Sequence, residues 1–265
     1  MLVKEISKIE ALCMIQKYHY SNTLPKLNKH YIGFFKNDEL VGVVTLGWGT
    51  RPLHTIKKIF PSLSTKDYYE IGRMCMSDDM PRNSESQMIS QLKDWVKKNH
   101  PEIKVLFTWA DGVMGKPGYV YQACSFLYCG YSLTDIYLKN GIKIHPRQMG
   151  YFFKEKKDTR IGIRPSFEQL KQNNIIHIRG RQFKYFTFLC NKSDRKKLLK
   201  ECNGKLISKY PKQKDLLWEI QIGKGIWQKC SKPTYKTDIS KYTKDIANIN
   251  TPKERQTNIF DFIKE

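Results

Sequence analysis

Apolar residues recur with two different spacings along this chain, and the alternation of the two predicts a protein built from both helices and strands. Residues 4–18 place apolar side chains three and four positions apart, which is the spacing of one helical face. Two apolar strands follow, HYIGFFKN and ELVGVVTLGWG, and they meet at Asn37 and Asp38. Because this dipeptide is typical of tight turns, the strands are predicted to form a hairpin.

A second helix is predicted in PRNSESQMISQLKDWVKKNHP, after a connection with two prolines and the strand DYYEIGRMCMSD. Asn83 or Ser84 is its N-cap, and Pro101 ends it. Next come the strand KVLFTWAD, a short helix GYVYQACSFLYCG closed by Gly130, and the strand-like segment YSLTDIYLKNGIKIHPRQMGYFF. This order predicts an α/β core over residues 1–153, with a mixed sheet flanked by helices.

The composition changes after residue 153. Residues 154–265 hold 27 Lys and Arg against 12 Asp and Glu, whereas residues 1–153 hold 20 against 13. Residues 154–228 contain a strand or two in IIHIRGRQFKYFTFLC and a helix in KSDRKKLLKECN, capped by Ser193 or Asn191. This basic C-terminal extension either completes the first sheet or forms a small lobe. Residues 229–265 are less hydrophobic and are expected to form a flexible tail.

The net charge of +22 indicates a polyanionic partner, with nucleic acid first, because each neutralised phosphate releases counterions. The charge alone leaves an anionic membrane or a merely soluble basic protein open. No apolar run approaches the roughly 18 residues of a spanning helix, and the start MLVKEISKIEALC lacks a signal-peptide core. An intracellular protein is therefore expected. The seven cysteines are odd in number and include no CxxC pair, which favours reduced thiols over structural zinc.

Polar residues occupy the ends of apolar elements in four stretches, KYHYS, YEIGRMCMSDDMPRNSES, FTWADG and GYVYQACSFLYCGY. Strand ends and the loops after them are where ligands bind in open α/β sheets. Each residue also has an ordinary structural explanation. His19 suits a helix C-terminus, Asp111 with Gly112 suits a turn, and the tyrosines suit the edge of a core. Ser84 and Ser86 suit a helix cap.

Together these stretches resemble the bacteriophage Mom proteins, over roughly residues 17–140. The resemblance implies a divergent fold of the GCN5-related N-acetyltransferase (GNAT) type. It also implies transfer of a carbamoylmethyl-type group to N6 of adenine in DNA, which protects the DNA from restriction enzymes in the cytoplasm of an infected bacterial host. The positions that match residues the family needs are the candidate catalytic residues His19, Tyr20, Asp111 and Tyr121.

The implied chemistry suits these residue types. The lone pair of adenine N6 is delocalised into the ring, so a base must take its proton as the new bond forms, and His19 or Asp111 can serve. A tyrosine hydroxyl can donate to a developing oxyanion or leaving group, and its ring can stack on the adenine. Since N6 is unreachable inside a duplex, the base must be flipped out.

The group donor is less clear from the sequence. Acetyltransferases of this fold hold pyrophosphate on a glycine-rich loop at a helix start, and the corresponding segment MPRNSES has no glycine. Acetyl-CoA is therefore disfavoured, and another acyl or aminoacyl carrier is expected. Iron is associated with the family, but His19 and Asp111 with tyrosines make a poor ligand set, and no metal ligand is predicted. The candidate donor-binding residues are Arg73, Arg82, Ser84 and Ser86.

Double-stranded DNA is the expected partner, and no membrane is expected. The candidate DNA-binding residues are Arg147, Arg179, Arg181 and Lys184. Two alternatives stay open: a GNAT-type N-acyltransferase acting on a protein or small-molecule amine, and a DNA-binding protein without catalysis.

The final residues, TPKERQTNIFDFIKE, contain a candidate peptide for a replication sliding clamp at 256–263. A glutamine for a polar pocket is followed by apolar residues for a groove, and the peptide would order on binding. The residues concerned are Gln256, Ile259, Phe262 and Ile263. Alternatively, Thr251, Pro252 and Glu254 begin a helix that docks on the protein itself.

Overall fold

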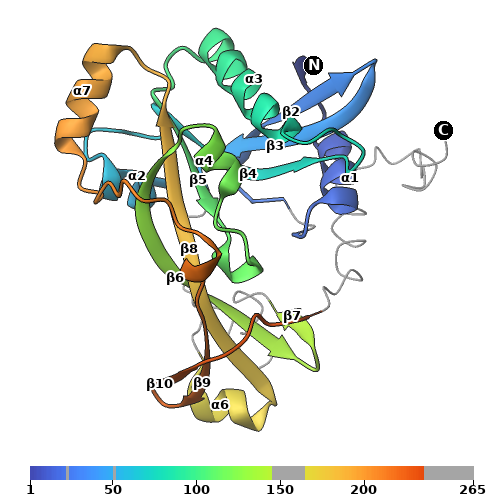
Figure 1. Cartoon of the computed structure of the whole chain (residues 1–265), viewed down its shortest axis with the longest axis vertical. Helices are drawn as coiled ribbons and strands as arrows, with labels where there is room; N and C mark the ends of the chain where they lie inside the picture. Colours follow the sequence, from blue (N-terminus) through green and yellow to red (C-terminus); the bar gives the residue numbers. More distant parts are fainter. Residues whose placement is uncertain (22–23, 50–51, 145–164, 236–265) are drawn as a thin grey trace.

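The computed structural model describes residues 1–21, 24–49, 52–144 and 165–235, and one large sheet with helices on both faces dominates them (Figure 1). The elements are β1 (Leu2–Glu5), α1 (Lys8–Tyr18), β2 (Asn28–Lys36), β3 (Glu39–Gly47), α2 (Pro52–Ile59), β4 (Tyr68–Met76), α3 (Ser84–Asn99), β5 (Val105–Ala110), the 3-10 turn η1 (Gly112–Met114), α4 (Tyr119–Ala123), β6 (Leu127–Lys139), β7 (Ile142–Ile144), α6 (Phe167–Gln172), β8 (Ile175–Phe188), α7 (Lys192–Glu201), the 3-10 turn η3 (Gln213–Asp215), β9 (Trp218–Gly223) and β10 (Ile226–Lys229).

The strands follow the order β1-β2-β3-β4-β5-β8-β6-β7, with β9 beside β8 and β10 beside β9. Within the described part of the chain only the β4–β5 pair is parallel, and the other strand pairs are antiparallel. The expected α/β class with a mixed, helix-flanked sheet is therefore confirmed. β8 lies between β5 and β6, so the sheet continues from the first 153 residues into the basic C-terminal part.

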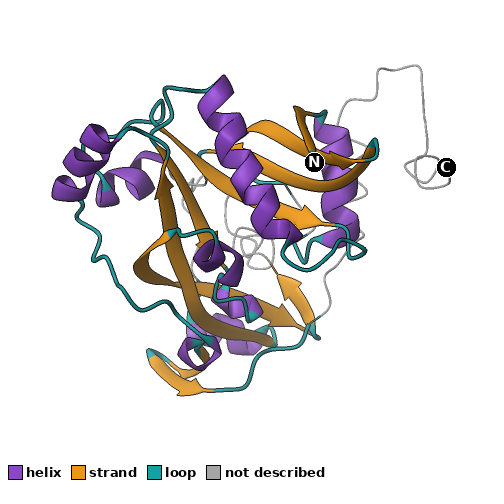
Figure 2. Cartoon of the chain, turned by 45° about the horizontal axis from the view of Figure 1, so that its top comes forward, coloured by secondary structure: helices purple, strands orange, loops and turns teal. Residues whose placement is uncertain are grey.

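The two faces of the sheet carry different helices (Figure 2). On one face, Met88, Ile89 and Leu92 of α3 pack into the largest apolar cluster, with residues of β2, β3, β4 and β5. On the other face, α1 packs Ala11 and Ile15 against strands β3 and β4. Burying these apolar stripes stabilises the fold, at about 25 cal/mol for each Å² removed from water.

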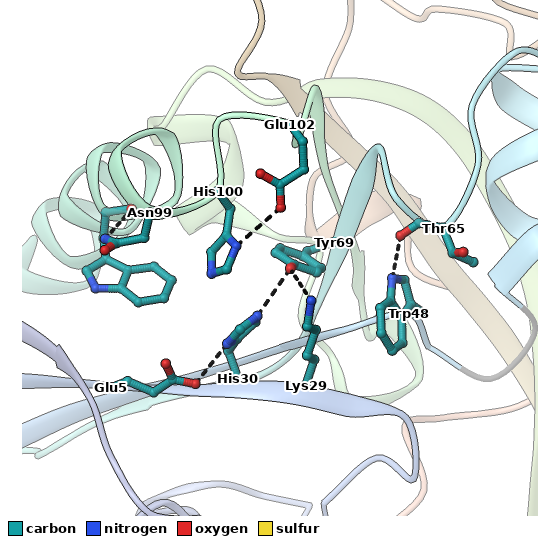
Figure 3. Close-up of polar contacts among 10 residues, drawn as sticks. Glu5, Lys29, His30, Trp48, Thr65, Tyr69, Asn99, His100 and Glu102 are labelled. Carbon is teal, nitrogen blue, oxygen red and sulfur yellow. Dashed lines mark hydrogen bonds and ion pairs between the residues drawn. The ribbon is translucent and has the colours of Figure 1, made fainter.

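A polar cluster ties the edge strands to the end of α3 (Figure 3). His30 of β2 holds Glu5 of β1 through Nδ1 at 2.8 Å, and its Nε2 lies 3.1 Å from the Tyr69 hydroxyl of β4. The ring of His100, the C-cap of α3, has its centroid 4.4 Å from that of His30, and its Nδ1 lies 3.3 Å from Glu102. These contacts join β1, β2, β4 and α3 across a large separation in sequence.

Several local predictions are confirmed. Asn37 and Asp38 adopt φ values of 50° and 63°, which suit the two-residue turn of a hairpin between β2 and β3. Asn191 caps α7, because its side-chain oxygen accepts from the Asp194 backbone N–H at 2.9 Å. All seven cysteines are free thiols.

Other local predictions are wrong. The helix predicted from residue 4 begins at Lys8, because Ser7 and Glu10 form a capping box, and the residues before it form β1. The predicted elements also omitted α2, whose first residue is Pro52. The short helix α4 ends at Ala123 and is not closed by Gly130, which lies in a bulge of β6.

A bulge in β4 sets the geometry of the site. Ile71 pairs with Leu46 while Arg73 pairs with the adjacent Thr45, so Gly72 is an extra residue in β4. A β-carbon at Gly72 would lie 2.8 Å from the Pro25 side chain, which leaves room only for glycine. In a regular strand the side chains alternate between the two faces of the sheet, so Glu70 and Arg73 would lie on opposite faces. The extra residue Gly72 shifts this alternation by one position and places Arg73 on the same face as Glu70.

Candidate active site

Side chains from the end of α1, the β4 bulge and the end of β5 meet at one place. The Tyr20 hydroxyl donates a long hydrogen bond to Asp111 Oδ2 at 3.5 Å, and the rings of His19 and Tyr20 stack with centroids 4.3 Å apart. Arg73 Nη2 donates to the Ser21 hydroxyl at 3.1 Å. The parallel β4–β5 pairing extends only to Ile71 and Thr108, so Arg73 and Asp111 both lie past its end. His19, Tyr20, Arg73 and Asp111, which lie far apart in sequence, are brought together there.

His19 is held as a neutral imidazole. It is the C-cap of α1, and its Nδ1 lies 2.9 Å from the backbone N and 3.0 Å from the carbonyl O of Ser21. Burial lowers the pKa of His19 to about 3, and the positive charges of Arg73 and Lys116 act in the same direction. With Nδ1 tied to the backbone, Nε2 is the ring nitrogen left for chemistry.

Asp111 follows β5 directly and is half-buried. Burial raises the pKa of its carboxyl, whereas the charges of Lys143 and Arg73 and hydrogen bonds from Met114 and Tyr20 lower it in part. The pKa of the Tyr20 phenol is raised by burial and by the nearby Asp111 carboxylate. Tyr20 therefore stays protonated and remains a hydrogen-bond donor.

The candidate Tyr121 lies on α4 and is only 8% exposed. Its ring packs against Phe126 and Tyr185, with centroids 5.4 and 5.7 Å away, and its hydroxyl is hydrogen-bonded to Thr108 of β5. Aromatic neighbours therefore cover most of the Tyr121 ring. Tyr121 is nevertheless close enough to Tyr20 to raise the pKa of that phenol.

Glu70 is a site residue that the sequence analysis missed. Its carboxylate lies against Gly49, where a β-carbon would come within 2.1 Å of Oε2, and it is hydrogen-bonded to Trp109. Burial raises the pKa of Glu70 to about 7, and the charge of Arg73 opposes that shift. The signal in the sequence was the acidic residue three positions before Arg73, but strict strand alternation would place the two on opposite faces.

Two lysines and a further tyrosine were also missed. Lys116 places its ammonium 4.9 Å from the centroid of the Tyr20 ring. Burial lowers the pKa of Lys143, and the charge of Asp111 partly offsets this shift. The Lys143 ammonium lies 5.2 Å from the centroid of the Tyr235 ring. Lys116 and Tyr235 lie outside regular elements and Lys143 lies in the short strand β7, so no local pattern signals this proximity.

The candidate donor-binding residues other than Arg73 lie at the start of α3. Arg82 is exposed and Ser86 is half-buried. Ser84 is buried, and its hydroxyl donates to the Pro81 carbonyl at 2.7 Å. Asn83 precedes the helix with φ 71° and makes no side-chain cap bond. Their role in holding a donor stays a prediction.

The candidate DNA-binding residues that the structure describes are engaged with neighbouring elements. Arg179 Nε donates to Glu219 at 2.7 Å, and Arg181 Nη1 donates to the Asp215 carbonyl at 2.7 Å. Lys184 has its ammonium 5.8 Å from the centroid of the Trp109 ring. Their binding of DNA stays a prediction. Arg147 and the candidate clamp residues Gln256, Ile259, Phe262 and Ile263 lie outside the described residues.

The described side chains do not fit an iron site. Within residues 1–21, 24–49, 52–144 and 165–235, no group of three or more His, Cys, Asp and Glu side chains is placed to hold a metal ion. His19 and Asp111 are the metal-type ligands of the cluster around Tyr20, and two such groups make a weak site. In the same part of the chain, no helix is long and apolar enough to cross a membrane.

Comparison with known proteins places this chain in a family. The model of the Mom protein family matches residues 1–212. The chain is also 31% identical over 212 residues to methylcarbamoylase mom of Escherichia phage Mu, a match that covers 79% of this chain and 83% of that protein.

The solved structures similar to this chain include acetyltransferases. An acetyltransferase of Bacillus subtilis, solved with CoA, is 12% identical, with a TM-score of 0.38 over 71% of this chain and 98% of that chain. An N-acetyltransferase of Staphylococcus aureus Mu50 is 13% identical, with a TM-score of 0.38 over 72% of this chain and 98% of that chain. The likeness is distant at these values.

Proposed function

Because the chain belongs to the Mom protein family, we propose that it is a transferase that adds a carbamoylmethyl-type group to N6 of adenine in phage DNA. The product would protect the DNA from restriction in the infected bacterial host. The observation that carries the proposal is the meeting of His19, Tyr20, Arg73 and Asp111 past the end of the β4–β5 pairing. The name of the phage Mu relative and the net charge of +22 support it.

In the proposed reaction, Asp111 is the base. A bond forms between adenine N6 and the carbon of the transferred group, the bond between that carbon and its carrier breaks, and the N6 proton passes to the Asp111 carboxylate. The electron pair of the broken bond leaves with the carrier. Lys143 and Arg73 favour the ionised carboxylate that this step requires, because their charges oppose the effect of burial on its pKa.

The neighbouring groups would stabilise charge and position the reactants. Tyr20 is a protonated phenol that donates to Asp111 in the free site, and once Asp111 holds the N6 proton the phenol can donate to the departing carrier instead. The Arg73 guanidinium supplies fixed positive charge beside it. Neutral His19, whose Nδ1 accepts from the Ser21 N–H, carries its proton on Nε2 and can donate a hydrogen bond there, and Glu70, with a pKa of about 7, is the second carboxyl near Arg73.

We place the donor at the start of α3. The helix has 16 residues, and the N–H groups of its first turn, with Arg82 and Ser86, suit an anionic group of an acyl or aminoacyl carrier. Ser84 is less suited, since its hydroxyl proton is already donated to Pro81.

The test is the DNA of cells that express the protein. Wild-type protein should yield a heavier deoxyadenosine, detected by mass spectrometry of digested DNA. Asp111→Asn should lower its amount at least about 100-fold, the lower end of the range of general base catalysis, and His19→Ala, which removes a supporting group, should lower it less. Glu102→Gln, an exposed acid beside His100, is the matched control and should equal wild type.

Two results would replace the proposal. Unmodified DNA together with an acylated protein or small amine would make the chain an N-acyltransferase of another substrate. DNA binding without any product, unchanged by Asp111→Asn, would make it a binding protein.

We also propose that the tail at 256–263 binds a sliding clamp. Removing residues 251–265 should weaken binding to a purified clamp, measured by calorimetry, while the melting temperature stays within about 2 °C. A fall of many degrees would favour the alternative in which the tail docks on the protein as a helix.

A further inference from the structure

The loop that carries Asp111 is held by a part of the chain that lies beyond the family match. This C-terminal segment, residues 213–235, follows the matched residues 1–212. The Trp218 indole donates to the Val113 carbonyl at 2.8 Å, and the Gln213 amide donates to the Gly115 carbonyl at 3.4 Å. Both acceptors belong to the turn that begins at Asp111, so the segment supports that turn directly.

The segment then returns to the site after β10. The backbone N–H of Cys230 donates to the Trp218 carbonyl at 3.0 Å, which holds the chain against β9. The Lys232 ammonium lies 3.1 Å from the position that a β-carbon on Gly115 would take. Tyr235 packs against the apolar cluster of Val113 and its neighbours, and its hydroxyl contacts Met114 Sδ.

Tyr235 stands beside the proposed base. Its phenol is close enough to Asp111 for the carboxylate, together with burial, to raise the pKa of the phenol to about 12. Lys143, which acts on Asp111 as well, has its ammonium 5.2 Å from the centroid of the Tyr235 ring. Tyr20 contacts Asp111 through its own hydroxyl, so two tyrosines from distant parts of the chain lie near one carboxylate.

The three tyrosines near the site differ in the ring surface they offer. The Tyr20 ring has His19 stacked 4.3 Å away and the Lys116 ammonium 4.9 Å from its centroid. The Tyr121 ring is 8% exposed and packs among aromatic neighbours. Tyr235 is half-buried, as Tyr20 is, but among the described residues no ring stacks on it, and its ring contact is the Lys143 ammonium 5.2 Å from the centroid. A flipped purine needs a flat apolar surface, since stacking recovers part of the cost of leaving the duplex.

We propose that Tyr235 is the aromatic wall against which the acceptor adenine stacks, and that the C-terminal segment thereby completes the acceptor pocket beside Asp111. This inference rests on the proposed function, because it takes a nucleobase as the acceptor. It makes Tyr235 a specificity-determining residue, supplied by a segment outside the part of the chain that matches the family.

The test combines the adduct formed in cells with a signal from the base itself. Tyr235→Ala should lower the heavier deoxyadenosine about 10-fold, and Tyr235→Phe should retain at least half of it, because the ring is kept. Purified full-length proteins are then mixed with oligonucleotides that carry 2-aminopurine, whose fluorescence is quenched by stacking on an aromatic ring. Wild type and Tyr235→Phe should quench it, and Tyr235→Ala should not, while overall DNA affinity by anisotropy changes less than about 3-fold.

Two further variants separate stacking from packing. Tyr235→Leu keeps apolar bulk against Val113 but has no flat ring. Its adduct level and its quenching should therefore be as low as those of Tyr235→Ala, which would show that the lost ring and not lost packing is the cause. Tyr119→Ala removes an exposed ring, 46% exposed, on α4 and should equal wild type. Tyr235→Leu activity equal to that of Tyr235→Phe would overturn the proposal.

Failure of this inference can be told from failure of the proposed function. A normal adduct with unchanged quenching in Tyr235→Ala would overturn the role of Tyr235 alone. Quenching that depends on Tyr235, with no adduct in any host, would overturn the proposed chemistry and keep the base-binding wall. Absence of both signals in wild type would overturn both.

Discussion

The charge state of His19 distinguishes the two roles that the sequence suggests for it, a cation at a helix C-terminus and a residue of the active site. A histidine at a helix C-terminus would gain from being positive, whereas here burial and the charges of Arg73 and Lys116 lower its pKa to about 3. The imidazole is therefore neutral at physiological pH. A neutral ring suits a hydrogen-bond donor or a stacked neighbour of Tyr20 better than a fixed cation.

The low pKa of His19 makes stability depend on pH. Its ordinary value is 6.5, so the unfolded chain takes up the proton first as pH falls, and this residue should lower the free energy of unfolding by about 1.4 kcal/mol per pH unit below 6.5, down to about pH 3. Urea melts at pH 7, 6 and 5 should show a weaker pH dependence in His19→Gln than in wild type. The exposed His54→Gln should leave the dependence unchanged. Equal slopes in all three proteins would contradict the neutral imidazole.

Lys143 should influence the pKa of the Asp111 carboxyl. Its positive charge lowers the pKa of the carboxyl against the larger effect of burial, so Lys143→Met should raise that pKa further and Lys143→Arg should leave it nearly unchanged. Carbon-13 NMR titration of the Asp111 carboxyl measures the shift directly. Since the base must be ionised, adduct formation in Lys143→Met cells should fall, and the loss should be larger at lower cytoplasmic pH. An unchanged carboxyl pKa in Lys143→Met would show that Lys143 does not lie near Asp111 in solution.

At the scale of the element, the bulge in β4 is the decisive feature. Gly72→Ala would place a β-carbon 2.8 Å from Pro25 and 3.1 Å from Thr45 Oγ1, so the strand must shift and Arg73 with it. We expect a loss of about 1–3 kcal/mol in unfolding free energy, typical of overpacking, and at least a 10-fold loss of adduct.

Gly204→Ala is the matched control for that variant, because its nearest atom would be 3.4 Å away, an ordinary contact. Denaturant melts and the nucleoside assay measure the two effects. Full activity in Gly72→Ala would mean that the bulge does not place Arg73.

The β4 bulge illustrates which features of the fold can be predicted from the sequence and which cannot. The β2–β3 hairpin and α3 follow from local signals, a two-residue turn and an apolar stripe ended by Pro101, and both were predicted. The place of Glu70 beside Arg73 depends on one extra residue in a strand, which alternation alone misses. Tyr235 reaches Met114 only through the β9–β10 hairpin, a pairing between segments that no local pattern specifies.

At the scale of the whole molecule, the net positive charge should contribute most of the affinity for DNA. The net charge is +22, and residues 154–265 carry 27 of the 47 Lys and Arg. If 6–10 phosphates are neutralised, affinity should fall about 10³- to 10⁵-fold between 50 and 200 mM salt. Fluorescence anisotropy over that range measures the slope. A nearly flat dependence would argue against a DNA substrate and for a small acceptor.

The motifs indicated the family and a set of candidate site residues, but the wider organisation required the structure. His19, Tyr20 and Asp111 were identified together because their short motifs are specific, and the structure places them in contact. The position of β8 could not be chosen beforehand, since its apolar pattern fits an added strand and a separate lobe equally well.

The place of β8 between β5 and β6 has a consequence for synthesis on the ribosome. Both partners are made at least 36 residues earlier than the strand that joins them, so each waits with an unpaired edge until residue 188 has left the exit tunnel. Nascent chains stalled near residue 150 should therefore be sensitive to proteases and bound by chaperones. The sheet can therefore be completed only late in translation, when most of the chain has been made.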